Sequence, residues 1–462
     1  MSMTRVRNAT ILAVIGLYLV LNYGFMLIRI PPASASGVPV GEVILVLALL
    51  GMNHFRVISR LQATVFLFPF LLWWTYGIGR ALSGFSDYGF WALRDATHEI
   101  ESLFLLVGFA FATRAEHLDR FFRWLPWMLG VGAVYALSFP FADTLMDFAP
   151  TIRSAAGHTV PVLFNYTSTS VLLLMGAAWL MLFRERTKVT VALQICLIGY
   201  AAFVFQARTI YLQIFALMIF FAAFRREAVG KGILGMIVIV LALLALPLTG
   251  IDIEGRLGQK VSFDFIVNHI LSIGGVESSG LRGTARGVSL RMVWWNHIIA
   301  NWSASFENMM LGLGFGMPLT NHHSLDGAIV REPHNSYLSV LGRTGLIGLF
   351  AFLWMHVLMI RAWWRAYRTS VRAHWREGQN RLLILMVFFI LIWVYAMGED
   401  ALEKPYFAIS YYFFWGIALK MAWQVARHPA SARDSRRPLH GAPGAAPGVV
   451  PARRLAPAPR RA

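Results

Sequence analysis

Long apolar stretches separated by short polar ones limit what this chain can fold into more than any other feature. A helix needs about 20 residues to cross the roughly 30 Å of hydrocarbon in a membrane. The sequence has twelve candidate stretches, centred near residues 19, 46, 70, 106, 133, 172, 197, 216, 241, 348, 390 and 415. The seventh and eighth are separated only by the sequence QART. The pattern predicts an all-α polytopic membrane protein with about twelve transmembrane helices.

The composition agrees with a membrane protein. Hydrophobic residues make up 57% of the 462 residues and charged residues 14%, whereas soluble domains carry about 25% charged residues. These values exclude a soluble enzyme and a disordered chain. The single cysteine, Cys196, lies in an apolar run, so neither an intrachain disulfide nor a cysteine metal cluster is possible.

The formal charge of +18 is distributed as membrane topology requires, rather than as nucleic-acid binding would. With twelve spans, the basic clusters in the short loops all fall on the side of both termini, which is therefore predicted to be cytoplasmic. The first apolar stretch has no small-residue cleavage site, so we expect an anchor. The clusters are Arg5/Arg7, Arg56/Arg60, Arg114/Arg120/Arg123, Arg184/Arg186/Lys188, Arg225/Arg226/Lys231 and the run from Arg361 to Arg381.

One long connection on the opposite face divides the chain. We expect transmembrane helices 1–9 in residues 1–250, and a periplasmic catalytic loop in residues 251–335. Helices 10–12 follow in residues 336–427. Residues 428–462 are rich in Pro, Ala and Arg, which predicts a disordered basic tail against anionic cytoplasmic lipid.

The long loop contains a second helical pattern. In VSLRMVWWNHIIANW the apolar residues recur at helical spacing, after the Gly/Ser-rich stretch SIGGVESSGLRGTARG. The spacing predicts an amphipathic helix that lies on the membrane or on the bundle. Its expected apolar face consists of Val288, Met292, Trp295, Ile299 and Trp302.

Two arginines on this face of the membrane are candidates for anion binding. Arg208 lies in the QART connection and Arg291 at the edge of the apolar face of the loop helix. A guanidinium near the start of a helix suits phosphate oxygens. The alternative for each is an arginine that extends to water or to lipid headgroups at the interface.

His334 lies at the point where the chain returns to the membrane. Pro333 disfavours a helix at Glu332, and Asn335 or Ser336 is a good helix cap, so a helix is predicted to begin there. Because the positive end of a helix dipole disfavours imidazolium, we expect a neutral ring that can accept a proton. The alternative is a structural histidine at the interface.

Other ionisable groups contribute less to the sequence-based interpretation. A proton-coupled transporter is expected to place acids or histidines within its spans, and none is obvious in the sequence. The acidic residues outside the eleventh span either bind sugar hydroxyls or solvate a turn, and the turn is the favoured interpretation. They are Glu399, Asp400 and Glu403.

The segment PHNSYLSVLGRTGLIGLF, preceded by LGLGFG at residues 311–316, resembles the O-antigen ligase/polymerase superfamily of bacterial membrane glycosyltransferases. That family has about twelve spans, both termini inside and a large late periplasmic loop. It places a His-Asn pair at the end of the loop, before a TG-x-x-G run, here Thr344 to Gly348. The family's essential arginines and histidine match Arg208, Arg291 and His334. The residue before the first arginine is Ala207 here, where the family has a different small or hydroxyl-bearing residue.

The resemblance implies transfer of a glycan from undecaprenyl diphosphate to a sugar hydroxyl of lipid A–core oligosaccharide, in the bacterial inner membrane. His334 would deprotonate the acceptor, and Arg208 and Arg291 would stabilise the departing diphosphate. We also expect substrate contacts from Asn335, Arg331, Arg282 and Arg286, with Arg256 and Lys260 as weaker candidates. No cofactor is expected, and no metal, because no acidic pair has clear metal-ligand spacing.

Two other functions remain open. A polymerase of O-antigen or exopolysaccharide units would use the same lipid-linked donor, fold and base. A polysaccharide transporter would need polar residues in a mid-membrane cavity and no large external loop. The loop of roughly 80 residues favours the enzyme.

Overall fold

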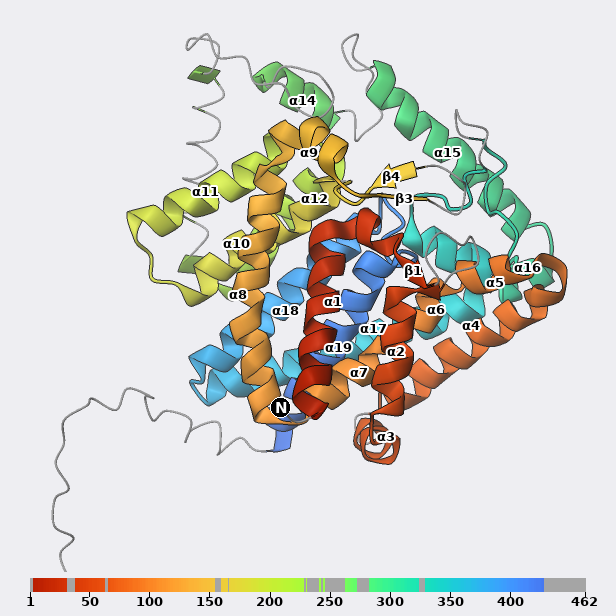
Figure 1. The fold of residues 1–462 in the computed structure, drawn as a ribbon, viewed down its shortest axis with the longest axis horizontal. Helices are drawn as coiled ribbons and strands as arrows, with labels where there is room; N and C mark the ends of the chain where they lie inside the picture. The colour runs from red at the N-terminus through yellow and green to blue at the C-terminus, as the bar shows by residue number, and fades with distance from the viewer. Residues whose placement is uncertain are drawn as a thin grey trace, which may run out of the picture.

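The computed structural model describes residues 3–30, 38–62, 65–153, 159–164, 166–227, 262–271, 282–323 and 329–427, together with residues 230, 241, 244 and 245. The expected basic tail and most of the Gly/Ser-rich stretch lie outside these residues. The described part is built from helices, with two small antiparallel hairpins, β1–β2 (Arg29–Ile30, Val38–Pro39) and β3–β4 (Thr151–Arg153, Thr159–Pro161) (Figure 1). The helices are α1 (Met3–Met26), α2 (Val40–Leu50), α3 (His54–Gln62), α4 (Leu67–Tyr88), α5 (Phe90–Asp95), α6 (Thr97–Glu101), α7 (Phe104–Phe111), α8 (Ala115–Leu137), α9 (Ala142–Phe148), α10 (Ser170–Phe183), α11 (Lys188–Phe203), α12 (Arg208–Phe224), α14 (Phe263–Leu271), α15 (Arg282–Trp302), α16 (Phe306–Leu311), α17 (Ser336–Arg372), α18 (Arg376–Tyr395) and α19 (Pro405–Arg427).

Helix α19 forms the centre of the bundle. It is apolar on all sides, and a helix of this kind is stable only when it is surrounded. Its aromatic residues from Tyr411 to Trp415 are fully buried. Glycines bring α7 and α19 into backbone contact: a Cβ on Gly108 would lie 2.0 Å from the carbonyl oxygen of Phe413. Small residues at such crossings are typical of helix packing in membranes.

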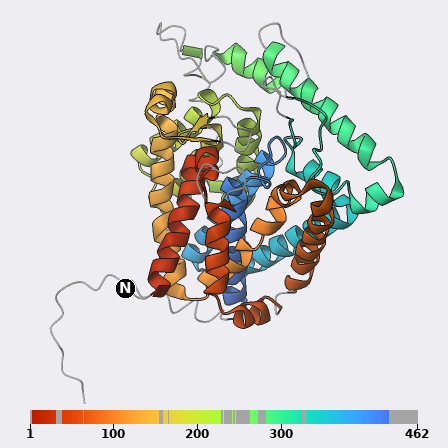
Figure 2. The same cartoon turned by 45° about the vertical axis from the view of Figure 1, so that its right-hand side comes forward.

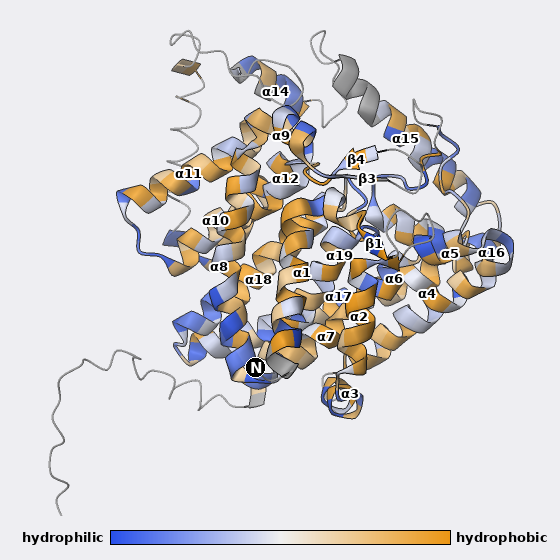
Figure 3. Ribbon diagram, viewed as in Figure 1, coloured by the Kyte–Doolittle hydropathy of each residue, from blue (hydrophilic) through white to orange (hydrophobic). Residues whose placement is uncertain are grey.

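Four described helical segments are long and apolar enough to cross a membrane, and six are if each of two bent pairs counts as one span. The four are Val6–Met26, Tyr166–Phe183, Ser336–Arg372 and Arg376–Tyr395. Helices α11 and α12 are shorter apolar helices, and residues 204–207 separate them, as the sequence predicts. Hydrophobic residues cover much of α1, α2 and α7 (Figure 3). An all-α membrane protein is therefore supported, with fewer spans by this criterion than the twelve expected.

The chain around residue 106 differs most clearly from the expectation of a single span. Three short helices, α5, α6 and α7, replace it, and the eight residues of α7 extend only about 12 Å at 1.5 Å per residue. The same region also contains buried titratable groups, which the sequence analysis did not expect within the apolar segments. His98, Glu99 and Glu101 are buried here, and His356 is buried within α17. Each of the two histidines is hydrogen-bonded to a tyrosine hydroxyl. Nε2 of His98 lies 2.6 Å from Oη of Tyr412, and Nε2 of His356 lies 2.6 Å from Oη of Tyr411.

Helix α17 begins where the sequence predicts and breaks where it carries the TG-x-x-G run. Asn335 caps it, with its side-chain oxygen accepting a hydrogen bond from Leu338 N–H at 3.1 Å. At Gly345 the backbone takes φ +63°, which interrupts the helix. The break leaves carbonyl oxygens of the preceding turn without partners inside the helix. The N–H of Leu313 donates a hydrogen bond to one of them, the carbonyl oxygen of Gly342, at 2.7 Å. A Cβ on Gly345 would lie 2.4 Å from the Met310 carbonyl oxygen, so the two glycine motifs interlock.

The helix predicted in the long loop is confirmed as α15, but its buried face is not the expected one. Trp294 and Ile298 are buried, whereas Met292 and Ile299 are exposed. The buried pair faces the bundle, and the indole N–H of Trp295 donates to the Pro333 carbonyl oxygen at 2.9 Å. The helix therefore lies on the bundle, directly against the segment that carries His334.

Candidate active site

Four segments far apart in the chain meet beside the start of α17. They are the first turn of α12, helix α15, the loop before α17 and the turn between α18 and α19. These segments carry the three residues that the sequence analysis selected, Arg208, Arg291 and His334. The structure brings all three together, and it adds Glu399 between two of them.

Glu399 bridges the loop helix and the histidine. Its Oε1 lies 3.0 Å from a guanidinium nitrogen of Arg291, and its Oε2 lies 3.1 Å from Nδ1 of His334. The side chains of His334, Glu399 and Arg291 are 35%, 34% and 31% exposed, so a substrate can reach them. Sequence reasoning favoured Glu399 as part of a solvated turn, because nothing local links it to a histidine 65 residues away.

Arg208 approaches Arg291 from the other side. It is the first residue of α12, and the positive charges of the two guanidinium groups repel each other. The turn at Gly398 holds these segments close: a Cβ there would lie 2.8 Å from Thr209 and 3.9 Å from the guanidinium of Arg291. A cluster of two arginines of this kind favours an anion between them.

The backbone takes an unusual conformation at both entry points to the site. His334 has φ +53° and Gln206, two residues before Arg208, has φ +48°. Non-glycine residues in this region cost on the order of 1–3 kcal/mol and cluster at functional sites. The buried ring of Trp294 holds the histidine in place, with ring centroids 5.7 Å apart.

The carboxylates around His334 shift its pKa in the direction opposite to the one that the helix dipole predicts. Burial lowers the pKa of His334, but Asp400 and Glu399 outweigh burial and raise that pKa above 6.5. Asp400 is buried, and its Oδ2 lies 3.4 Å from Nδ1. The helix-dipole argument failed because two nearby carboxylates act more strongly on the ring than the partial charge of a helix end.

The same contacts decide the state of Glu399. Burial raises the pKa of Glu399, but His334 and Arg291 lower it more, and the net shift is downward from 4.5. Glu399 is therefore ionised at neutral pH. Since both carboxylates approach Nδ1, that nitrogen carries the proton and donates it, which leaves Nε2 as the basic nitrogen of the ring.

Glu403 contacts the first residue of α17, and its hydrogen bond does not involve His334. It accepts a hydrogen bond from the hydroxyl of Ser336, the first residue of α17. Burial, followed by the charges of Asp400 and Glu332, raises its pKa to about 8. Glu403 is therefore mostly uncharged at pH 7, and its contact fixes the start of α17 against the turn.

Arg331 lies in a separate ionic cluster. Its guanidinium donates to both carboxylate oxygens of Asp95, at 3.1 and 2.6 Å, and lies 4.3 Å from the ring centroid of Trp91. Arg343 also pairs with Asp95, at 3.0 Å, and with Glu332, at 2.9 Å. The cluster ties α5 and α17 to the glycine loop, because Asp95 also accepts from the Gly316 N–H at 3.0 Å.

The structure describes the remaining predicted substrate contacts only in part. Asn335 acts as the cap of α17, and Arg282 and Arg286 lie in the first part of α15, where their side chains are outside what the structure describes. Arg256 and Lys260 also lie outside the described residues. Within the described ranges, no three His, Cys, Asp or Glu side chains are arranged to hold a metal ion.

Comparison with known families identifies part of the chain. Residues 192–353 match the family model described as O-antigen ligase. The matched range includes Arg208, Arg291 and His334 and ends before Glu399 and Asp400. A search among curated proteins gives no significant match.

Proposed function

The chain belongs, through residues 192–353, to the O-antigen ligase family, and we propose that it transfers a glycan from undecaprenyl diphosphate to a sugar hydroxyl of lipid A–core oligosaccharide. The reaction belongs to lipopolysaccharide biosynthesis. The protein would lie in the bacterial inner membrane with about twelve transmembrane segments, both termini in the cytoplasm and the site at the periplasmic face. The observation that carries the proposal is the series of contacts from Arg291 through Glu399 to His334.

His334 acts as the general base. Its Nε2 accepts the proton of the acceptor hydroxyl while the hydroxyl oxygen attacks the anomeric carbon of the donor. The new glycosidic bond forms as the bond to the diphosphate oxygen breaks. Asp400 and Glu399 stabilise the imidazolium that results, since both lie within 3.4 Å of Nδ1.

Arg208 and Arg291 stabilise the leaving diphosphate. Two guanidinium groups held near each other repel, and Glu399 pairs with the Arg291 side of this cluster. A diphosphate would relieve this repulsion, and it would do so most as charge develops on the bridging oxygen. Such preorganised electrostatics is commonly the largest contribution to catalysis. The arginine pair would thus take the part that a divalent cation plays in other sugar transferases.

Four further residues have a proposed role in substrate binding. Asn335, Arg282, Arg286 and Arg331 would contribute to substrate binding, directly or by holding the loop. Residues 251–335 would form the periplasmic catalytic loop, to which α12 adds Arg208 and the turn before α19 adds Glu399. The partners are the lipid-linked glycan, the acceptor glycolipid and the surrounding lipids.

Deletion of the gene, followed by electrophoresis of the envelope glycolipids, tests the proposal. A ligase predicts loss of all long-chain lipid A species while lipid-linked polymer accumulates. Wild-type protein should restore the ladder, and His334→Ala should not, although it reaches the membrane in equal amount. Lipid A capped by single repeat units would instead identify a polymerase. Normal polymer on lipid A after deletion would contradict both activities.

A further inference from the structure

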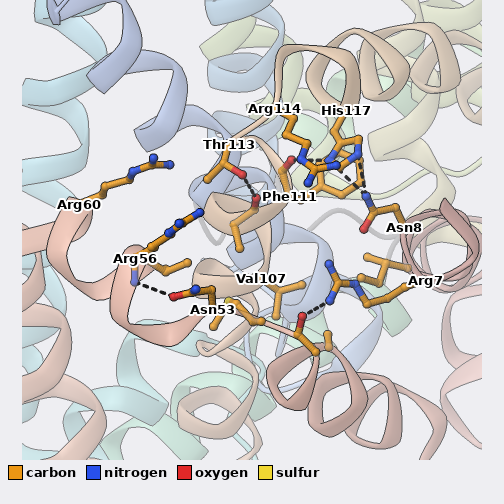
Figure 4. A pocket seen from close by; sticks show the side chains of 16 residues that line it. Arg7, Asn8, Asn53, Arg56, Arg60, Val107, Phe111, Thr113, Arg114 and His117 are labelled. Atoms are coloured by element: carbon orange, nitrogen blue, oxygen red, sulfur yellow. Dashed lines mark hydrogen bonds between the residues drawn. The ribbon is translucent and has the colours of Figure 1, made fainter. Parts of the chain in front are cut away.

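A polar cavity lies at the end of the molecule opposite the candidate active site. Figures 1 and 2 both place the start of α1 and helix α3 at one end and helices α14 and α15 at the other. The cavity has a volume of about 330 Å³ and lies between α1, the α2–α3 bend, α7 and the start of α8 (Figure 4).

The lining of this cavity is strongly basic. Sixteen described residues line it, and among them there are four arginines and no Asp or Glu. The arginines come from three separate parts of the fold: Arg7 from α1, Arg56 and Arg60 from α3, and Arg114 from the turn before α8. Figure 4 shows Arg56 and Arg60 on one side of the pocket and Arg114 across from them. Four positive charges around one cavity, with no carboxylate among its described lining residues, favour an anion there.

The polar wall of the cavity is ordered by hydrogen bonds. Nδ1 of His117 lies 3.2 Å from the carbonyl oxygen of Phe111, and the Asn8 amide nitrogen lies 3.2 Å from the ring. Donation by Nδ1 to the carbonyl leaves Nε2 to accept from Asn8, so this histidine is a neutral wall residue. Arg7 donates to the carbonyl oxygen of Gly51 and thereby fixes the bend beside α1. The positive charge of the cavity therefore comes from the arginines.

Helix α3 places the cavity at a membrane surface. It turns by 93° from α2 and lies across the end of the bundle. Val57 and Leu61 are buried on its inner side, whereas Phe55 is 84% exposed and Ile58 43% exposed. A short helix with an exposed aromatic residue and basic residues beside it is typical of an interfacial helix. With α3 as an interfacial helix, the cavity beside it would lie at the level of the lipid headgroups.

We propose that this cavity binds the phosphate headgroup of an anionic phospholipid. A phosphate has oxygens on several sides, and planar guanidinium groups from three directions can each donate to them. Basic pockets between transmembrane helices on the cytoplasmic side suit such headgroups. The volume is sufficient for a headgroup and falls at the lower end of ordinary ligand sites. The site is independent of the glycan-transfer chemistry.

Native mass spectrometry of the purified full-length protein tests the site, with phosphatidylglycerol, phosphatidylcholine and inorganic diphosphate as the three probes. Wild-type protein should bind phosphatidylglycerol in preference to the other two. Arg56→Gln/Arg114→Gln should weaken that binding by roughly 25-fold, about fivefold for each arginine near an anionic lipid. Both side chains are exposed, so the variant should unfold at the wild-type temperature.

The matched control is Arg184→Gln/Arg226→Gln, which removes two exposed arginines of the same predicted side away from the cavity. It should bind phosphatidylglycerol within about twofold of wild type. Equal loss in both variants would mean a general surface-charge effect and would overturn the proposal. Equal or tighter binding of diphosphate would assign a soluble anion to the cavity and overturn the lipid. Equal binding of phosphatidylcholine would remove the requirement for an anion.

Discussion

Nδ1 of His334 lies 3.1 Å from Oε2 of Glu399, on a turn that follows it by 65 residues in the chain. The contact fixes the ring, directs its proton toward the carboxylate and leaves Nε2 free for a substrate. The other oxygen of Glu399 bonds to Arg291, so one carboxylate connects the proposed base with the proposed diphosphate site.

The first prediction concerns the pH dependence of transfer. The base must be unprotonated, so the rate should fall as the pH falls through the pKa of His334, which Asp400 and Glu399 raise above 6.5. Glu399→Gln removes one of these charges and lowers that pKa, so the acidic limb of the kcat profile should move to lower pH. Misplacement of the ring should also lower kcat by about 10²-fold.

Asp400→Asn separates the two effects, because it leaves the Glu399–Arg291 pair intact. It should move the acidic limb in the same direction, with a smaller loss of kcat. Profiles of both variants that coincide with wild type would show that His334 does not titrate in the reaction.

The second prediction concerns the shape of the arginine side chains. Arg208→Lys and Arg291→Lys keep the charge but lose the planar fork that donates to two phosphate oxygens. Each should lower kcat/KM by at least about tenfold with the lipid-linked donor. Arg184→Lys, on the exposed loop between α10 and α11, should stay within about twofold. Full activity in both Arg208→Lys and Arg291→Lys would show that these arginines do not need to grip the diphosphate through two oxygens.

The third prediction concerns metal ions. With Arg208 and Arg291 as the groups that balance the diphosphate charge, turnover of the purified enzyme should persist in excess chelator. Activity is measured with and without added magnesium or manganese. Loss of turnover that either ion restores would assign the leaving-group role to a cation.

The fourth prediction concerns the interlocked glycines. Gly345→Ala places a Cβ 2.4 Å from the Met310 carbonyl oxygen, at a residue with φ +63°. We expect destabilisation by roughly 1–3 kcal/mol or more, measured as a lower thermal midpoint of the detergent-solubilised protein.

Gly79→Ala in α4 is the matched control, since a Cβ there meets nothing within 4 Å. It should be neutral, or stabilising by up to about 1 kcal/mol. An equal thermal midpoint for the two variants would show that the contact between the glycine motifs contributes nothing to stability.

The fifth prediction concerns orientation. In a Cys196→Ala background, cysteines at the exposed positions Ser303 and Arg372 should lie on opposite faces of the membrane. An impermeant maleimide should label position 303 and not position 372 in intact spheroplasts. Labelling at 372 alone would reverse the topology, and labelling at both would place the two positions on one side.

Features that depend on neighbouring residues could be predicted from the sequence. The start of α17 follows from Pro333 and the Asn335 cap, the helicity of α15 from its periodicity, and the separation of α11 from α12 from the QART sequence. Arg208, Arg291 and His334 could be selected because each is a basic residue at a boundary between an apolar segment and a polar one. Their roles remain proposals.

Features that depend on which helices lie side by side required the tertiary structure. The partnership of Glu399 with His334, and with it the direction of the pKa shift, arises only when the turn before α19 meets the start of α17. The buried face of α15 depends on the bundle beneath it. The spacing of apolar residues alone does not determine which face of the helix packs against other helices. Arg331 pairs with Asp95 for the same reason. Side-chain interactions act through space over a few ångströms, whereas a sequence pattern reports only on residues within a turn or two of one another.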